Sequence, residues 1–138
     1  MFNDTYGAQA KGALRIVAGL LFLLHGTTKL FGIPPFAHGD LPAMGSFMWV
    51  GGVIELVTGL LVMLGWFTRP AAFIASGQMA VAYWMFHAPK DLYPTNNGGD
   101  ASIMFCFIFL MFAASGPGAF SIDADRNRKL VSVDDELE

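Results

Sequence analysis

The stretch Phe47-Met-Trp-Val-Gly-Gly-Val-Ile-Glu-Leu-Val-Thr-Gly-Leu-Leu-Val-Met-Leu64 decides the fold. It consists mainly of apolar residues and glycines and contains one carboxylate, Glu55. Its length is close to the ~20 residues that a membrane-spanning helix needs. A charged carboxylate at the centre of a bilayer costs roughly 2.5 kcal/mol or more. Glu55 therefore needs a partner inside the protein.

The whole chain is apolar for its length. Its 138 residues are the size of one domain, and 54% of them are hydrophobic while only 14% are charged. The sequence contains no basic cluster of the kind that would predict nucleic-acid binding. The single cysteine, Cys106, excludes an intramolecular disulfide and a thiolate zinc site. The N-terminus lacks the basic region of a cleaved signal peptide, so we expect the first apolar segment to remain as an anchor.

Four apolar segments are expected to form membrane-spanning helices, because a helix satisfies its own backbone hydrogen bonds in lipid. Gly-, Pro- and Asn-rich turns separate them. The sequence thus predicts an all-α membrane protein, a four-transmembrane-helix bundle over residues 1–120 with a charged cytoplasmic tail over 121–138. A soluble bundle of buried helices is the alternative, and apolar character around each whole helix disfavours it. The segments run from Ala13 to Phe31, Phe47 to Phe67, Pro70 to His87, and Ala101 to about Phe120.

Positive charges predict the orientation. Four spans place both termini on one side, and the positive-inside rule makes that side cytoplasmic. Within this arrangement we expect Arg15 to extend its guanidinium to the membrane interface, and both Arg15 and Arg69 to act as cytoplasmic-side anchors on anionic lipid head groups. The cations on the cytoplasmic side are Lys11, Arg15, Arg69, Arg126, Arg128 and Lys129, against Lys29 and Lys90 on the other side.

Five ionisable residues are predicted to share the outer half of the bilayer: His25, Lys29, Glu55, His87 and Asp100. At 1.5 Å per residue, His25 lies roughly 9 Å, and Glu55 roughly 12 Å, below the outer ends of their segments. Lys29 is one turn above His25 on nearly the same face and can reach Glu55. His87 stands near the outer end of the third segment. Asp100 begins the fourth, where an anion favours the helix N-terminus.

This set has two interpretations. In the first, Glu55 and Lys29 form an ion pair that holds helices together, with His25 as a neutral neighbour. In the second, the residues line a polar pocket that binds a quinone head group or relays protons, because histidine and glutamate can exchange protons near neutral pH. A metal site is disfavoured because no two histidines have i, i+3 or i, i+4 spacing. Haem ligation by His25 and His87 has no supporting motif.

Six short motifs follow one another along the chain: Arg15 with Gly19 and Phe22, His25-Gly26 with Lys29, Gly51-Gly52 with Glu55, Gly65 with Thr68-Arg69, Asn97-Gly98-Gly99-Asp100, and Gly116-Pro117-Gly118 with Ser121 and Asp123. Taken in order, these motifs resemble the DoxX family of small four-helix bacterial membrane proteins, over about residues 12 to 125. The resemblance implies a multi-pass protein of a bacterial inner membrane, with functional candidates at Arg15, His25, Lys29, Glu55, Arg69 and Asp100. Asp100 departs from the family, which usually has Glu after the paired glycines; the charge is kept and the reach is shorter.

The resemblance implies a function linked to redox chemistry, because relatives of the family include a subunit of a thiosulfate:quinone oxidoreductase and some members associate with other redox proteins. The chain has no nucleotide-binding GxGxxG and no haem-attachment CxxCH. A quinone is thus the expected ligand, electrons would come from a partner, and catalysis would belong to the complex. The expected partners are the bilayer and other membrane or redox subunits, or further copies of the chain. A non-enzymatic assembly or anchoring subunit and a small carrier are the alternatives.

Overall fold

The computed structural model describes residues 4–37 and 39–126, and all regular structure within these ranges is helical. Helix α1 spans Asp4–Phe31 and α2 spans Phe47–Leu64. Helix α3, Thr68–Ala82, continues into a π-helical segment, η1, over Tyr83–His87. The short α4, Pro94–Asn97, precedes α5, which spans Asp100–Ser115. Residues 122–126 are also helical.

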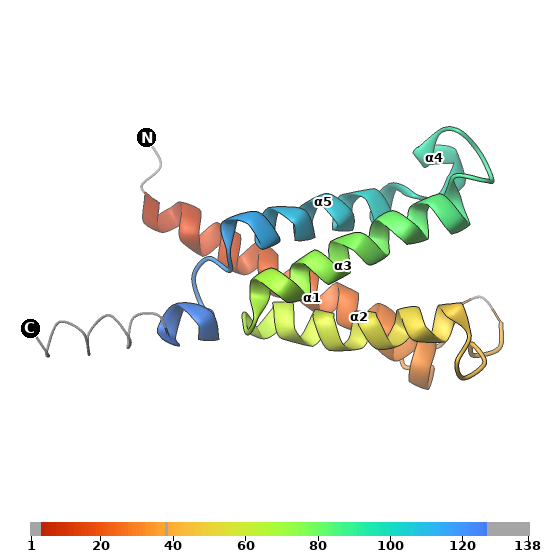
Figure 1. Ribbon diagram of the computed structural model, residues 1–138, viewed down its shortest axis with the longest axis horizontal. Coiled ribbons are helices and arrows are strands. Elements are labelled where there is room, and N and C mark those ends of the chain that lie inside the picture. Colours follow the sequence, from red (N-terminus) through yellow and green to blue (C-terminus); the bar gives the residue numbers. More distant parts are fainter. Residues whose placement is uncertain (1–3, 38, 127–138) are drawn as a thin grey trace, which may run out of the picture.

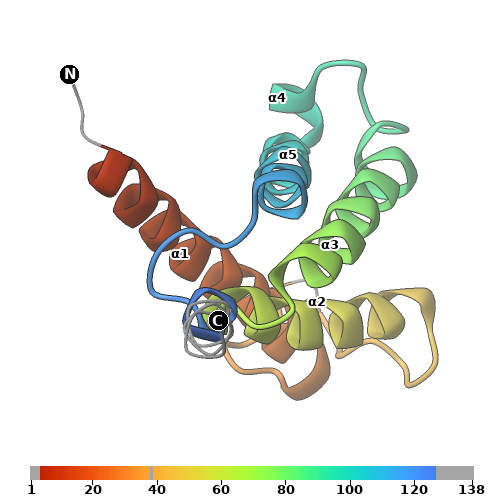
Figure 2. The ribbon, with the colours of Figure 1, turned by 60° about the vertical axis from the view of Figure 1, so that its left-hand side comes forward.

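The long helices pack as two pairs. Helix α1 packs mainly on α2 and α5 mainly on α3, while α2 and α3 join the pairs. Contacts between α1 and α5 are few, and Figure 2 shows these two helices standing apart. The start of α1, the α2–α3 turn and the segment after α5 lie at one end of the molecule (Figure 1). We call this the terminal end, and the opposite end, where residues 32–46 and 88–99 connect the helices, the loop end.

The predicted spans appear as helices with altered limits. Helix α1 begins well before Ala13. Helix α2 ends at Leu64 because Gly65 adopts a left-handed C-cap with φ 68°. The fourth helix was expected to reach about Phe120, and it ends at Ser115. Gly116, with φ 79°, turns the chain there, and the following proline has no N–H with which to continue the helix.

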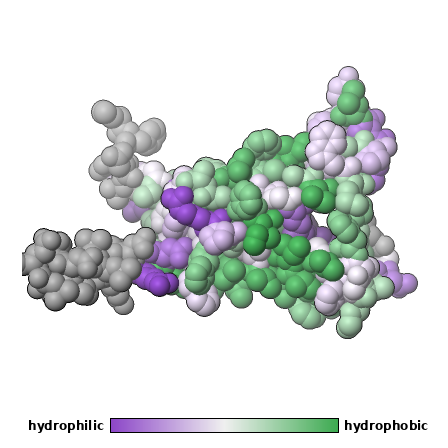
Figure 3. Space-filling view, viewed as in Figure 1, coloured by the Kyte–Doolittle hydropathy of each residue, from purple (hydrophilic) through white to green (hydrophobic). Residues whose placement is uncertain are grey.

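Within the described residues, two helices are long and apolar enough to cross a membrane, namely α1 over Tyr6–Phe31 and α2 over Phe47–Leu64. Helix α5 is apolar but has only 16 residues. Figure 3 shows hydrophobic surface over the middle of the helices and hydrophilic surface toward both ends. Large apolar side chains point outward there, for example Phe73 and Phe107, which are 66% and 64% exposed. Such a surface suits contact with lipid.

Glycines set the distance between α1 and α2. A Cβ added at Gly26 would lie 2.5 Å from the backbone nitrogen of Leu56, and one at Gly59 would lie 2.6 Å from that of Leu23. Gly19 makes an equally close approach to Met63. The backbones of α1 and α2 therefore approach closely at these glycines, and close backbone packing of this kind is what holds helices together in lipid.

Gly26→Ala is therefore expected to destabilise the protein by about 1–3 kcal/mol, because the added methyl group pushes α1 and α2 apart. The matched control is Gly77→Ala. Gly77 is in α3 and has nothing within 4 Å of its added Cβ. The control should be neutral or stabilising by up to about 1 kcal/mol, because alanine favours the helix. Denaturant titration of the purified protein in detergent measures both, and equal effects would contradict the packing argument.

Candidate functional site

A polar cluster joins three helices on the loop-end side of the bundle. Lys29 Nζ of α1 lies 2.5 Å from Glu55 Oε1 of α2. Gln78 Nε2 of α3 donates to the same Glu55 oxygen at 3.2 Å and to the Gly51 carbonyl at 3.0 Å. Glu55 is only 1% exposed, whereas the Lys29 side chain is 21% exposed. We call Lys29, Glu55 and Gln78 the interhelical cluster.

Two acceptors of this cluster have no partner among the described residues. They are Glu55 Oε2 and Gln78 Oε1, and both are buried. The amide of Gln78 cannot be turned over, because the Gly51 carbonyl only accepts hydrogen bonds and must face the NH₂ group. An unsatisfied buried acceptor costs roughly 1–3 kcal/mol. The cluster thus contains two buried acceptors that no described donor satisfies.

His25 lies next to this cluster on α1 and is exposed. Its Nδ1 is 2.8 Å from the Leu21 carbonyl, so Nδ1 carries the proton and Nε2 is left for other contacts. The ring stands 6.0 Å from that of Phe105 in α5, and a charge on His25 acts on Glu55. His25 is therefore a surface-accessible proton-exchanging group beside a buried carboxylate.

His87 and Asp100 belong to a separate group. His87 Nδ1 is 3.1 Å from the Asn97 carbonyl, and its ring stacks on Tyr83 at 6.4 Å. Asp100 is exposed at the first residue of α5. No hydrogen bond or ion pair between described residues connects either side chain to the interhelical cluster. Nor do three His, Cys, Asp or Glu side chains in the described ranges stand close enough to hold a metal.

Gln78 was not among the residues predicted from the sequence. Ser76, another polar residue of this segment, donates to the Cys106 carbonyl at 2.8 Å. The sequence does contain a signal that points to Gln78. It is an amide side chain in an otherwise apolar segment, and at 1.5 Å per residue it stands roughly 13 Å below the outer end, close to the expected depth of Glu55.

Arg15 has a different environment from the one expected. Its guanidinium does not extend to the membrane interface, because the residue is 0% exposed. It donates instead to five backbone carbonyls, at distances from 2.5 to 3.3 Å. Two of these carbonyls are in the last turn of α2, and three belong to the segment after α5. Arg15 thus ties α1 to both segments at the terminal end. The acceptors are Val62, Met63, Pro117, Ala119 and Phe120.

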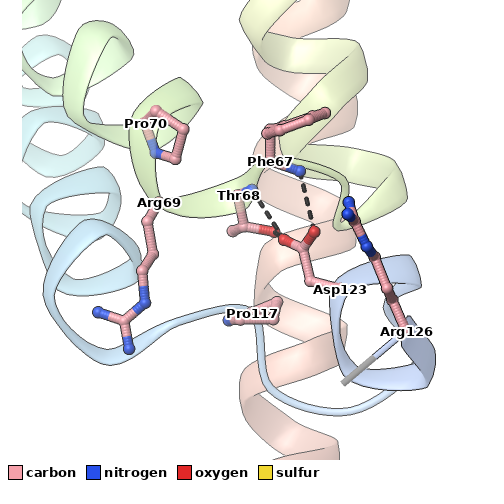
Figure 4. A pocket seen from close by; sticks show the side chains of 7 residues that line it. All are labelled: Phe67, Thr68, Arg69, Pro70, Pro117, Asp123 and Arg126. Atoms are coloured by element: carbon pink, nitrogen blue, oxygen red, sulfur yellow. Dashed lines mark hydrogen bonds between the residues drawn. The ribbon is translucent and has the colours of Figure 1, made fainter. Parts of the chain in front are cut away.

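Asp123 fastens the same segment to the start of α3 (Figure 4). Its Oδ1 accepts from the Phe67 N–H at 3.0 Å, and its Oδ2 accepts from the backbone N–H and the hydroxyl of Thr68 at 2.9 and 2.8 Å. Phe67 has φ 49°, a conformation that side-chain-bearing residues rarely adopt and that needs such support. Residues 121–126, the described part of the predicted tail, therefore pack on the bundle. Residues 127–138 lie outside the described ranges.

Arg69, the second predicted anchor, is exposed at the terminal end. Its Nη1 donates to the carbonyls of Ala113 and Ala114, at 3.2 and 2.6 Å, at the C-terminal end of α5. A cation there is favourable because the helix dipole is negative at that end. Arg69 also borders a pocket of about 350 Å³, shown in Figure 4 and lined by Phe67, Thr68, Arg69, Pro70, Pro117, Asp123 and Arg126.

Residues 10–88 match the DoxX family. The chain is 42% identical to an uncharacterized protein of Haemophilus influenzae, over 80% of this chain and 85% of the relative. It is 31% identical to an uncharacterized membrane protein of Mycobacterium tuberculosis, over 80% and 77%. It is also 31% identical to the inner membrane protein YqjF of Escherichia coli, over 83% and 90%. No solved structure matches the chain.

Arg15→Lys is expected to lower the free energy of unfolding by roughly 2 kcal/mol or more. Lysine has three donors, so at least two of the five buried carbonyls would lose their partner. Arg126→Lys is the matched control, because Arg126 is exposed and makes no hydrogen bond with another described residue; it should stay within about 0.5 kcal/mol. Unfolding in detergent measures both, and an unchanged Arg15→Lys would show that the carbonyl contacts are dispensable.

Proposed function

The chain belongs to the DoxX family of membrane proteins, and from that premise we propose that it is a multi-pass inner-membrane subunit of a quinone-linked redox complex. In this proposal α1, α2, α3 with η1, and α5 are the four spans, and the interhelical cluster contacts the quinone head group. Electrons pass between the quinone and a partner subunit, because the chain has no electron-carrier motif.

The distribution of charge supports the proposed orientation, with both termini in the cytoplasm. Lys11, Arg69 and Arg126 lie at the terminal end, while Lys90 is at the loop end. The positive-inside rule assigns the more basic end to the cytoplasm. The charged segment 121–138 would then be cytoplasmic, and the interhelical cluster would lie in the outer half of the bilayer.

One observation carries the proposed binding role: Glu55 is buried with one carboxylate oxygen unpartnered, next to an unpartnered amide oxygen of Gln78. These acceptors match the hydroxyl groups of a reduced quinone. Lys29 has three donors and Glu55 uses one, so another could reach a quinone carbonyl. His25, exposed beside the cluster, could exchange a proton with the surface. The cluster thus has groups suited to both redox states of the head group.

A non-enzymatic assembly or anchoring role is the second candidate. The observation that favours it is that Lys29, Glu55 and Gln78 connect α1, α2 and α3. In this view the cluster is a clamp between helices. The two roles can be separated by replacing Lys29 and Glu55 with apolar side chains. Apolar replacement of a buried ion pair is often neutral or stabilising for the fold, so a loss of quinone from such a variant would not be caused by unfolding.

We expect the double variant Lys29→Met with Glu55→Met to keep the fold and to lose roughly tenfold or more of the quinone that copurifies with the wild type, because hydrogen bonds to charged groups are lost. Mass spectrometry of lipid extracts measures the quinone, and thermal unfolding in detergent measures the fold. Ser76→Ala, a buried polar substitution in α3 outside the cluster, is the control and should retain quinone.

Two results would count against this binding role. The first is wild-type levels of quinone in the folded double variant. The second is an absence of quinone in the wild type when it is purified from membranes that contain it. A folded wild type without quinone, together with loss of partner subunits from the double variant, would favour the clamp.

A further inference from the structure

Three cations at the terminal end have no acidic partner among the described residues. Lys11, Arg69 and Arg126 make no ion pair with any carboxylate in the part of the chain that the structure describes. Lys11 Nζ donates to the Ser115 carbonyl at 2.7 Å, directly beside the carbonyls that accept from Arg69. Arg69 and Lys11 are close enough to repel one another. Like charges held side by side favour an anion between them.

The nearby carboxylate of Asp123 adds a negative charge to this surface but forms no ion pair with these three cations. Asp123 has both oxygens occupied by the backbone and hydroxyl of the α2–α3 turn. Arg69 uses only Nη1 for the carbonyls of α5, so Nε and Nη2 are still available as donors. Arg126 forms no hydrogen bond with another described residue. Several cationic donors therefore border the 350 Å³ pocket.

We propose that the Lys11, Arg69 and Arg126 surface binds the head group of an anionic phospholipid, with one phosphate between Lys11 and Arg69. Figure 4 shows Arg69 and Arg126 on opposite sides of Asp123. A lipid with two phosphates, such as cardiolipin, can place the second one at Arg126. Guanidinium groups suit this role because they bind phosphate oxygens in a fork geometry.

The surrounding surface favours a lipid over a free anion. Phe67 lines the pocket and is exposed, and Trp66 and Phe120 are exposed in the same turn and segment. Aromatic side chains of this kind are typical of membrane–water interfaces. A phosphate bound here would have apolar side chains next to it, where the acyl chains of a lipid begin. This site is independent of the interhelical cluster.

The test uses the full-length protein, delipidated in a non-ionic detergent. Bound lipid is counted by native mass spectrometry, and thermal unfolding is followed with added cardiolipin, phosphatidylglycerol, phosphatidylcholine or inorganic phosphate. We expect the wild type to retain cardiolipin over phosphatidylglycerol, and both over phosphatidylcholine. Lys11→Gln should weaken binding of both anionic lipids roughly fivefold, whereas Arg126→Gln should weaken cardiolipin by a similar factor and so remove its advantage.

A control variant and a measurement of the fold accompany these binding experiments. Lys90→Gln removes an exposed cation from the loop end and should leave lipid binding unchanged. The Lys11 and Arg126 variants spare the contacts of Arg69 with α5, so circular dichroism should show an intact fold. Equal retention of phosphatidylcholine, an equal loss in Lys90→Gln, or unchanged cardiolipin binding in folded Lys11→Gln and Arg126→Gln would overturn the proposal. Stabilisation by inorganic phosphate equal to that by cardiolipin would overturn the lipid assignment.

Discussion

The fold depends on one buried guanidinium. Arg15 reaches from α1 to the carbonyls that end α2 and to those of the segment after α5, and it has no exposed surface. A buried charge is tolerated only when its donors are matched, and carbonyls at a helix C-terminus carry partial negative charge. The segment held by Arg15 in turn brings Asp123 to the first turn of α3. One side chain thus fixes the relation of all the long helices at the terminal end.

The parts of this structure that could be predicted rest on side-chain patterns. Apolar runs indicated the helices, and depth along the helices paired Lys29 with Glu55. Arg15 could not be placed in the same way. Its acceptors are backbone carbonyls, which every residue has, so the sequence carries no sign of which ones it meets. The only guide to the position of the Arg15 guanidinium was its place near a helix end, which suggested the membrane interface.

Loop geometry explains the other differences. Gly116 and Pro117 end the fourth helix early, and the chain that follows returns to α1 and the α2–α3 turn. The early end is what makes Pro117, Ala119 and Phe120 carbonyls available to Arg15. The same reversal brings Arg126 alongside Thr68, so that residues expected in a separate tail border the pocket.

The two polar centres of this protein differ in how completely they are satisfied, and that contrast bears on the proposed function. At Arg15 a buried charged group meets five acceptors, which shows that this fold can satisfy a buried charge when the role is structural. At the interhelical cluster, Lys29 and Gln78 both bind Glu55 Oε1, and Oε2 has no described partner. A clamp would gain from a donor at Oε2, because an unpaired buried oxygen costs free energy. The buried, unpartnered oxygen is what a ligand with a hydroxyl donor would satisfy, and the proposed ligand role of Glu55 rests on it.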